Sequence, residues 1–440
     1  MNDGVSETRG RQVDMNHSMN LRVEWRNLLS EIRSKEGFQN FLRGRLHAEY
    51  LRAGDQGPVL VLIPSVLGCY GLIIYDSQIE AVEFKFTFGD LVNLANGFTK
   101  SRRRVAQTER ELVKARAVAE REDGTNADRH RYQRAKQDVH TERIRANGHL
   151  RDLLDTLWLT IMQPVIARLC LHDTANLSSL SRLWICPAGP FTALPLHAAE
   201  AKTSDPRSFD SLLRCAIASY TPSIRALLGS RDRSPVHLWT DEGSQVTGLA
   251  VVMEETSGEV PLSNGKAEVQ AFKRLLQPNA VKVLAGHRAT RGNVRDNLRV
   301  SHVAHFSCHG LQNLFDPTAG GLLVHDGLLT VDQIGSSHYE GQLAFLSACE
   351  TAATGPTIPD EAMTLASALH HRGYRQVIAC MWSVYDPAAA DIVAGTYASL
   401  RSGCDGLSAA AYALHDAIHE QRSARPEFPG LWAPFAHTGP

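Results

Sequence analysis

The chain has 440 residues, 43% of them hydrophobic and 21% charged, as in ordinary globular proteins with two or three domain-sized units. Its formal net charge of -1 gives no reason to expect nucleic acid or an anionic membrane as the main partner. Eight dispersed cysteines without a C-x-x-C pair favour a reducing compartment and disfavour a zinc site. The polar start resembles no signal peptide, and no apolar run approaches the ~18 residues of a spanning helix. We therefore expect a cytoplasmic protein.

The N-terminal part of the chain predicts helices around one small β-structure. Residues 1–20 are polar without periodicity and predict a disordered leader. Apolar residues at helical spacing predict a helical segment over 21–54. Between 58 and 87, three β-rich runs separated by tight turns predict an antiparallel meander. Residues 90–170 predict helices again, and their mixed-sign charged stretch, 101–147, predicts an exposed hairpin or linker.

From residue 182 onward, short apolar runs alternate with helical patterns. The apolar runs lie at 183–186, 249–253, 281–284, 303–308, 343–347 and 376–382. The helical patterns lie at Lys266–Leu276, Thr290–Leu298, Glu361–His371 and Pro387–Leu400. Such alternation predicts an α/β fold, with a parallel sheet, right-handed crossovers and helices on both faces. Asp326-Gly327 predicts a hairpin inserted at 320–330.

Two of the predicted strands end in reactive side chains. His309 and Gly310 follow the run at 303–308, and Cys349 follows the run at 343–347. Because the carboxyl ends of neighbouring parallel strands meet at one edge of a sheet, His309 and Cys349 are candidates for a common site. An imidazole beside a thiol can take its proton or pair with the thiolate, which makes a nucleophile. Taken singly, each residue also fits a structural role, as a buried thiol or a hydrogen-bonded histidine.

Cys308 is adjacent to His309, but we do not expect the two to form a pair. Neighbouring residues of a strand point to opposite faces, so their side chains diverge. His302 and His305 precede the end of the same run, and we expect them to have packing or surface roles. Cys349 therefore stays the candidate nucleophile.

The order of these motifs resembles the CHAT family of caspase-like clan CD cysteine peptidases. The family's His-Gly motif after one strand matches His309-Gly310, and its Ser-Ala-Cys motif after the next matches Ser347–Cys349. Further motifs in family order are Trp184–Leu196, Tyr220–Ser223, Pro359–Ala362, Gly373–Ile378, Met381–Asp386 and Trp432–His437. The resemblance implies a CHAT module over 55–440 with a caspase-like α/β core at 182–440. CHAT modules often follow tetratricopeptide arrays, and this sequence shows none.

The resemblance implies a role for each candidate residue. Cys349 would be the nucleophile and His309 the base of a His-Cys dyad. The backbone amides of Gly310 and Cys349 would form the oxyanion hole, and Ser347 and Asp386 would line the specificity pocket. The resemblance also implies no metal or organic cofactor. It implies a protein or peptide substrate and allows regulatory protein partners.

An acidic Asp386 in the pocket would favour Lys or Arg before the scissile bond, through charge-assisted hydrogen bonds. The same residue suits the cap of a helix beginning at Pro387, and the two roles are compatible. Asp326 and Glu361 lie in segments predicted near the same sheet edge and could supply the charge instead. The sequence does not rank the three carboxylates.

The sequence leaves three classes of function open. The leading hypothesis is a cysteine endopeptidase that uses His309 and Cys349. A catalytically silent CHAT scaffold for protein–protein interaction or signalling would use the same fold, since fold does not imply function. A non-peptidase acyl hydrolase is the third hypothesis.

Overall fold

The computed structural model describes residues 21–36, 38, 41, 47–121, 123–171, 180–202, 210–234, 246–256, 258–276, 278–311, 313, 316–348, 364–383, 386–403 and 409–440. The chain divides into two compact units, Met1–Arg52 and Ala53–Pro440. The first unit contains a helix at 21–33 and the short helix α2 (His47–Leu51). The predicted disordered leader lies outside the described residues.

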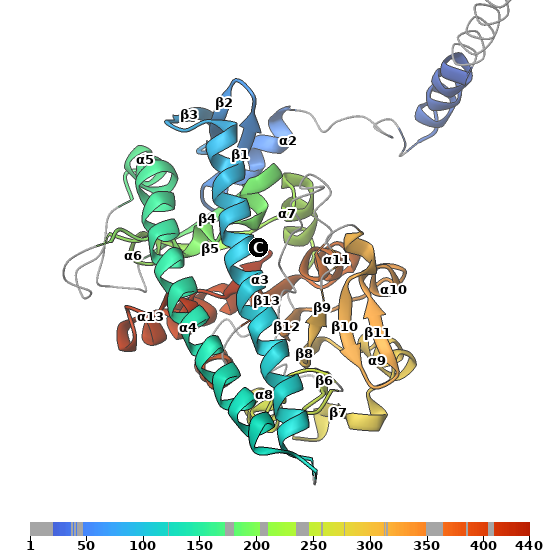
Figure 1. The fold of residues 1–440 in the computed structure, drawn as a ribbon. Helices are drawn as coiled ribbons and strands as arrows, with labels where there is room; N and C mark the ends of the chain where they lie inside the picture. Colours follow the sequence, from blue (N-terminus) through green and yellow to red (C-terminus); the bar gives the residue numbers. More distant parts are fainter. Residues whose placement is uncertain are drawn as a thin grey trace, which may run out of the picture. The chain divides into compact units, whose positions relative to one another are not determined.

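The second unit is built around one large sheet (Figure 1). Its strands are β1 (Val59–Ser65), β2 (Gly68–Tyr75), β3 (Gln78–Phe84), β4 (Ser181–Pro187), β5 (Ala216–Tyr220), β6 (Gly248–Val252), β7 (Val281–Ala285), β8 (Val303–Ser307), β12 (Leu343–Ser347), β13 (Gln376–Cys380) and β14 (Phe435–Thr438). In the described part of the chain these eleven strands have the order β3-β2-β1-β4-β5-β14-β13-β12-β8-β6-β7. A separate small sheet holds β9 (Gly310–Leu311), β10 (Gly321–Val324) and β11 (Gly327–Thr330).

Helices connect and cover these strands. They are α3 (Phe88–Ala119), α4 (Asn126–Leu157), α5 (Gln163–Arg168), α6 (Leu212–Cys215), α7 (Ile224–Arg231), α8 (Gly265–Leu275), α9 (Arg291–Leu298), α10 (Val331–Gly335), α11 (Leu365–Arg372), α12 (Asp386–Ser402), α13 (Ala410–Ala424) and α14 (Pro429–Trp432). The predicted helix at Glu361–His371 begins at Leu365 instead, because the Thr364 hydroxyl accepts a hydrogen bond from the Ser367 amide and caps it there.

Strand pairing confirms the predicted parallel-rich α/β sheet. Two runs of neighbouring strands are parallel. One run is β1-β4-β5-β14, and the other is β13-β12-β8-β6-β7. The predicted meander is also confirmed, since β1, β2 and β3 pair antiparallel. Because β1 pairs with β4, the meander extends the same sheet. The predicted hairpin is β10–β11, which turns between Val324 and Gly327.

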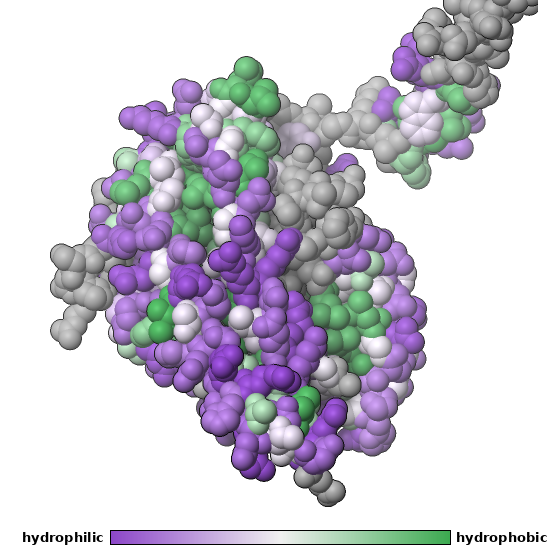
Figure 2. Space-filling model, in the orientation of Figure 1, coloured by the Kyte–Doolittle hydropathy of each residue, from purple (hydrophilic) through white to green (hydrophobic). Residues whose placement is uncertain are grey.

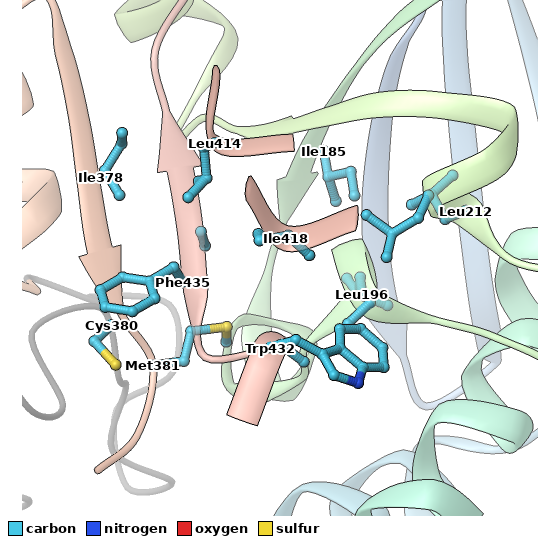
Figure 3. Packing of buried hydrophobic residues seen from close by; sticks show 14 of the residues in the cluster. Ile185, Leu196, Leu212, Ile378, Cys380, Met381, Leu414, Ile418, Trp432 and Phe435 are labelled. Atoms are coloured by element: carbon cyan, nitrogen blue, oxygen red, sulfur yellow. The ribbon is translucent and has the colours of Figure 1, made fainter. Parts of the chain in front are cut away.

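The strand β14 joins two halves of the sheet. It pairs antiparallel with β13 over four residue pairs, and Thr438 pairs with Tyr220 of β5. Beside this junction, Figure 3 shows Ile378 and Phe435 from the two antiparallel strands near Leu414 and Ile418 of α13. These side chains belong to one buried apolar cluster. The closing strand therefore sits in the interior of the sheet, with partners on both sides.

The two faces of the sheet bury separate hydrophobic clusters. Alternate residues of β8 supply Val303 to the cluster formed with α8, α12 and α13, and Phe306 to the cluster formed with α9, α10 and α11. In β12, Phe345 and Leu346 divide in the same way. This alternation is what the pleat of a strand imposes. It confirms the predicted helices on both faces.

The charged stretch folds as two long helices, α3 and α4. Each begins with a capping box, formed by Thr87 with Asp90 and by Thr125 with Asp128. Both helices bury a narrow apolar stripe and carry mixed charges outside it. Figure 2 shows a largely hydrophilic surface over this pair of helices.

Limited proteolysis is expected to cut first at the turn between α3 and α4, near Gly124. The turn lies between two helix ends, where few contacts oppose local opening, and Arg121 and Asp123 are exposed. Mass spectrometry of early tryptic fragments measures this. Hydrogen exchange that ranks this turn among the most protected segments would contradict the expectation.

A π-helical turn precedes Pro164. The helix α4 continues through η2 (Trp158–Met162), which is a π-helix, into α5. Pro164 has no N–H to donate to the carbonyl of Thr160, and its ring crowds that carbonyl. A wider turn just before the proline lets the helix pass it without ending.

Candidate active site

The carboxyl ends of β8 and β12 lie side by side and level with each other. The two strands are parallel, and Ser307 pairs with Ser347 in register. His309 and Cys349 each follow their paired serine by two residues. Cys349 itself lies outside the described residues. The register brings the described ends of β8 and β12, Ser307 and Ser347, level with each other at one edge of the sheet.

The imidazole of His309 is held by a backbone carbonyl. Only 8% of His309 is exposed, and its Nε2 lies 2.8 Å from the carbonyl oxygen of Val260. A carbonyl oxygen can only accept, so Nε2 carries the proton and donates. In the neutral ring the lone pair is then on Nδ1. The contact thus selects the tautomer in which Nδ1 can act as a base.

The backbone amide of Gly310 points away from the small sheet. Leu323 donates its N–H to the carbonyl of His309 at 2.8 Å, so these two residues form a hydrogen-bonded pair of the antiparallel ladder. Gly310, which pairs with Leu322, is next in the ladder. Hydrogen-bonded and non-hydrogen-bonded pairs alternate, so the Gly310 N–H is directed away from β10. It points to the side of β9 opposite to β10.

Ser347 bonds to a buried carboxylate. Its Oγ donates to Oε1 of Glu268 at 2.9 Å. The other oxygen of Glu268, Oε2, lies 3.2 Å from Nε2 of His305, and Nδ1 of that ring lies 2.8 Å from the hydroxyl of Tyr397. Glu268 is 2% exposed and His305 is fully buried. The prediction for His305 is thereby refined: it is a packed residue, and it is also part of a polar network.

Cys308 faces away from this network. It is 1% exposed and packs in the apolar cluster that contains Ala304 and Phe306. His305 lies between Ala304 and Phe306 in β8, so it points to the opposite face, the α8 side of the sheet, where it meets Glu268. Cys308 and Glu268 therefore lie on opposite faces of the sheet.

The structure describes the positions of two of the three candidate pocket residues, Asp386 and Asp326. Asp386 is the first residue of α12, one position before the predicted helix start at Pro387. Asp326 is tied to Arg291, which donates its backbone N–H at 2.8 Å and contacts the carboxylate through its side chain at 3.4 Å. Although desolvation opposes ionisation, these bonds lower the pKa of Asp326. Glu361 lies outside the described residues. Asp326 is therefore already engaged at the start of α9.

A cavity of about 700 Å³ lies elsewhere, between α3 and α4. Its lining includes Leu94, Phe98, Leu150 and Leu153, but none of the candidate site residues. The sequence prediction places the chemistry at the sheet edge instead, and the volume of a cavity alone supplies no reactive group. Among the described residues, no three His, Cys, Asp or Glu side chains group as a metal site would require.

Glu268 is the residue of this site that the sequence prediction missed. In α8 the buried stripe runs through Gly265, Val269, Phe272 and Leu275, and Glu268 lies on it. A charged residue on the apolar face of an amphipathic helix is unusual, because burying a carboxylate is costly unless it is hydrogen-bonded. That irregularity is visible in the sequence and could have singled out Glu268.

Comparison with known families decides the classification. The sequence model of the CHAT domain matches residues 151–440. The chain belongs to the CHAT domain family. The match begins in α4, while the meander and α3 precede it in the same compact unit. No curated protein sequence matches this CHAT protein.

Two solved structures are similar to this chain to different degrees. The separase of Saccharomyces cerevisiae, crystallised as a separase–securin complex, matches with a TM-score of 0.56 at 8% identity. The match covers 89% of this chain and 31% of the separase chain, so the CHAT protein spans about a third of that relative. The Arg-specific cysteine proteinase gingipain R gives a TM-score of 0.41 at 9% identity, over 66% of this chain and 67% of its own. At such identities the separase match shows the fold alone.

None of the helices in the described part of the chain is both long and apolar enough to span a membrane.

Proposed function

We propose that this CHAT protein is a cysteine endopeptidase with Cys349 as nucleophile and His309 as general base. The observation that carries the proposal is the level register of β8 and β12, with His309 and Cys349 two residues beyond the paired serines. The bond from His309 Nε2 to the Val260 carbonyl supports it further, because it leaves Nδ1 as the basic nitrogen. Membership of the CHAT family and the caspase-like fold agree with this chemistry.

In the proposed reaction His309 Nδ1 takes the proton of the Cys349 thiol, and the sulfur attacks the carbonyl carbon of the scissile peptide. As the tetrahedral intermediate collapses, the C–N bond breaks and His309 returns the proton to the leaving amine. Water then attacks the thioester, with His309 again taking a proton, and the carboxylic acid leaves as the thiol re-forms. No electron transfer is involved.

The developing oxyanion needs donors at the sheet edge. The N–H of Gly310 is directed away from β10, which suits a donor to substrate, and we propose the Cys349 N–H as the second donor. Such donors act best when they are fixed before the reaction. Gly310 is fixed by the β9–β10 ladder.

An electrophilic thiol probe tests the proposal most directly. The wild type is expected to label at Cys349 and to cleave peptides, and Cys349→Ala is expected to lose both. We propose a protein or peptide substrate and, because separase was crystallised in a complex with securin, regulatory protein partners as well. Labelling without any peptide cleavage would favour the silent scaffold, and turnover of small esters alone would favour an acyl hydrolase.

We further propose that Asp386 and Ser347 line the specificity pocket, so that Asp386→Asn lowers cleavage after Lys or Arg at least tenfold. A carboxylate selects a cationic side chain through charge-assisted hydrogen bonds. Asn keeps the size and much of the capping ability of Asp at the start of α12, so the melting temperature should change little. A peptide-library profile of the wild type beside Asp386→Asn measures this.

The control for that experiment is Asp326→Asn. Asp326 is bound to Arg291, and its loss should alter stability without altering the cleavage profile. A wild-type preference for acidic or apolar residues, or a basic preference that Asp386→Asn leaves intact, would remove Asp386 from the pocket.

A further inference from the structure

Glu268 is a buried carboxylate that the proposed reaction does not use. It is 2% exposed and projects from the first turn of α8 toward the sheet. Taking a carboxylate out of water costs several kcal/mol, by general estimates, unless its oxygens are well hydrogen-bonded. Both oxygens of Glu268 have partners, Ser347 at 2.9 Å and His305 at 3.2 Å. Each oxygen of this buried carboxylate therefore has the hydrogen-bond partner that a buried charge requires.

The direction of each hydrogen bond in this network follows from its chemistry. An ionised carboxylate only accepts, so the Ser347 hydroxyl and the His305 Nε2–H both donate to Glu268. Burial, and then the charge of Glu268, raise the pKa of Tyr397 well above its usual range, so its hydroxyl stays protonated. That hydroxyl can donate to His305 Nδ1, 2.8 Å away, when the ring is neutral. All four side chains are then satisfied in one chain of bonds.

The network ties together four elements at the sheet edge. His305 belongs to β8, Ser347 ends β12, Glu268 belongs to α8 and Tyr397 to α12. Ser347 is two residues before Cys349, and His305 is four residues before His309. His305 and Ser347 both bond to Glu268, so both point to the α8 side of the sheet, and Ser347 is the last residue of β12.

The segment leading into α8 also holds His309 directly. Val260, eight residues before Glu268, accepts the His309 Nε2–H at 2.8 Å. The stretch from Val260 to Glu268 thus contacts His309 at its first residue and Ser347, the end of β12, at its last. The close fit of α8 against the strands supports this: a Cβ on Gly265 would lie 3.2 Å from Ser307 Oγ and 3.0 Å from Val252.

We infer that Glu268 is a positioning residue that sets the end of β12, and with it Cys349, relative to His309. The inference rests on the proposed function for its catalytic consequence. Glu268 touches no reacting atom in it. It acts through Ser347, whose hydroxyl it holds, and through His305, which it locks into the donor tautomer. Small displacements of a reacting pair lower the rate of the chemical step far more than they lower substrate binding.

Glu268→Gln is the first test, because it keeps the volume and removes the charge and one acceptor. We expect kcat for a peptide substrate to fall about 10- to 100-fold with KM nearly unchanged. Hydrogen exchange of the amides of β12 should become faster in the same variant. Ser347→Ala should lower kcat similarly, and the double variant should be no worse than either single one, since both remove the same link.

The matched control is Thr396→Val on α12. Thr396 is fully buried, adjacent to Tyr397, and donates to the Ile392 carbonyl at 2.7 Å. Its replacement removes a buried hydrogen bond without touching Glu268, so it should lower the melting temperature while leaving kcat and β12 exchange unchanged.

The outcomes separate this inference from the proposed function. If Glu268→Gln matches Thr396→Val in both kcat and β12 exchange, Glu268 has a structural role only and the inference is wrong. A wild type that neither labels nor cleaves would refute the proposed function. In that case β12 exchange still decides whether Glu268 positions the strand end.

Discussion

Replacing Cys349 or His309 with alanine is expected to remove nearly all peptide turnover, a loss of roughly 10⁴-fold or more. The thiol without its base is mostly protonated at neutral pH, and the base without the thiol has nothing to activate. Because the pair acts as a unit, combining the two substitutions should add little. Single-turnover cleavage of a peptide substrate measures the loss, with circular dichroism to confirm folding.

Cys308→Ser is the matched control for the dyad. Cys308 points to the side of the sheet opposite to Glu268, where it packs with Ala304 and Phe306. Serine at this position places a hydroxyl in an apolar cluster, which should lower the stability of the protein and leave the rate of peptide cleavage unchanged. If Cys308→Ser were as inactive as Cys349→Ala while both stayed folded, the nucleophile would be misassigned.

Gly373→Ala is expected to destabilise the protein by at least about 3 kcal/mol. Gly373 ends α11 with φ near +132°, and a Cβ built there would lie 1.6 Å from the carbonyl oxygen of Tyr339. Neither backbone segment can move without displacing β13, which begins three residues later. Urea denaturation followed by tryptophan fluorescence measures the change in midpoint.

Gly148→Ala is the control for this change. Gly148 lies in α4 with open space around the site of a Cβ, and alanine should stabilise that helix by about 1 kcal/mol. An unchanged urea midpoint for Gly373→Ala would mean that the turn can relax.

Much of the fold was accessible from the sequence because apolar runs and helical periodicities are local signals. The runs that became β8 and β12 predicted both the strands and the positions of His309 and Gly310 beyond them. Their register was not accessible, because it depends on how strands pair across about forty residues of intervening chain. The place of β14 between β5 and β13 is likewise a long-range choice that periodicity does not encode.

The candidate site was predicted less completely than the fold. His309 was recognisable by its place after a strand, whereas its bond to Val260 depends on a loop conformation. Glu268 was missed because a helix with one acidic residue on its apolar stripe still has the periodicity of an ordinary surface helix. Its role can be recognised only in the folded structure, where His305 of β8 and Ser347 of β12 bond to it.

The interior place of β14 has a consequence for biosynthesis. In the order of synthesis β14 follows every other described strand, yet its neighbours β5 and β13 are already made. Until β14 emerges from the ribosome, each of those strands presents an open edge of unpaired backbone groups. A nascent chain in that state would be prone to pair with the wrong partner and would need chaperone protection. Closure of the sheet must then wait for β14, the last of the described strands in chain order.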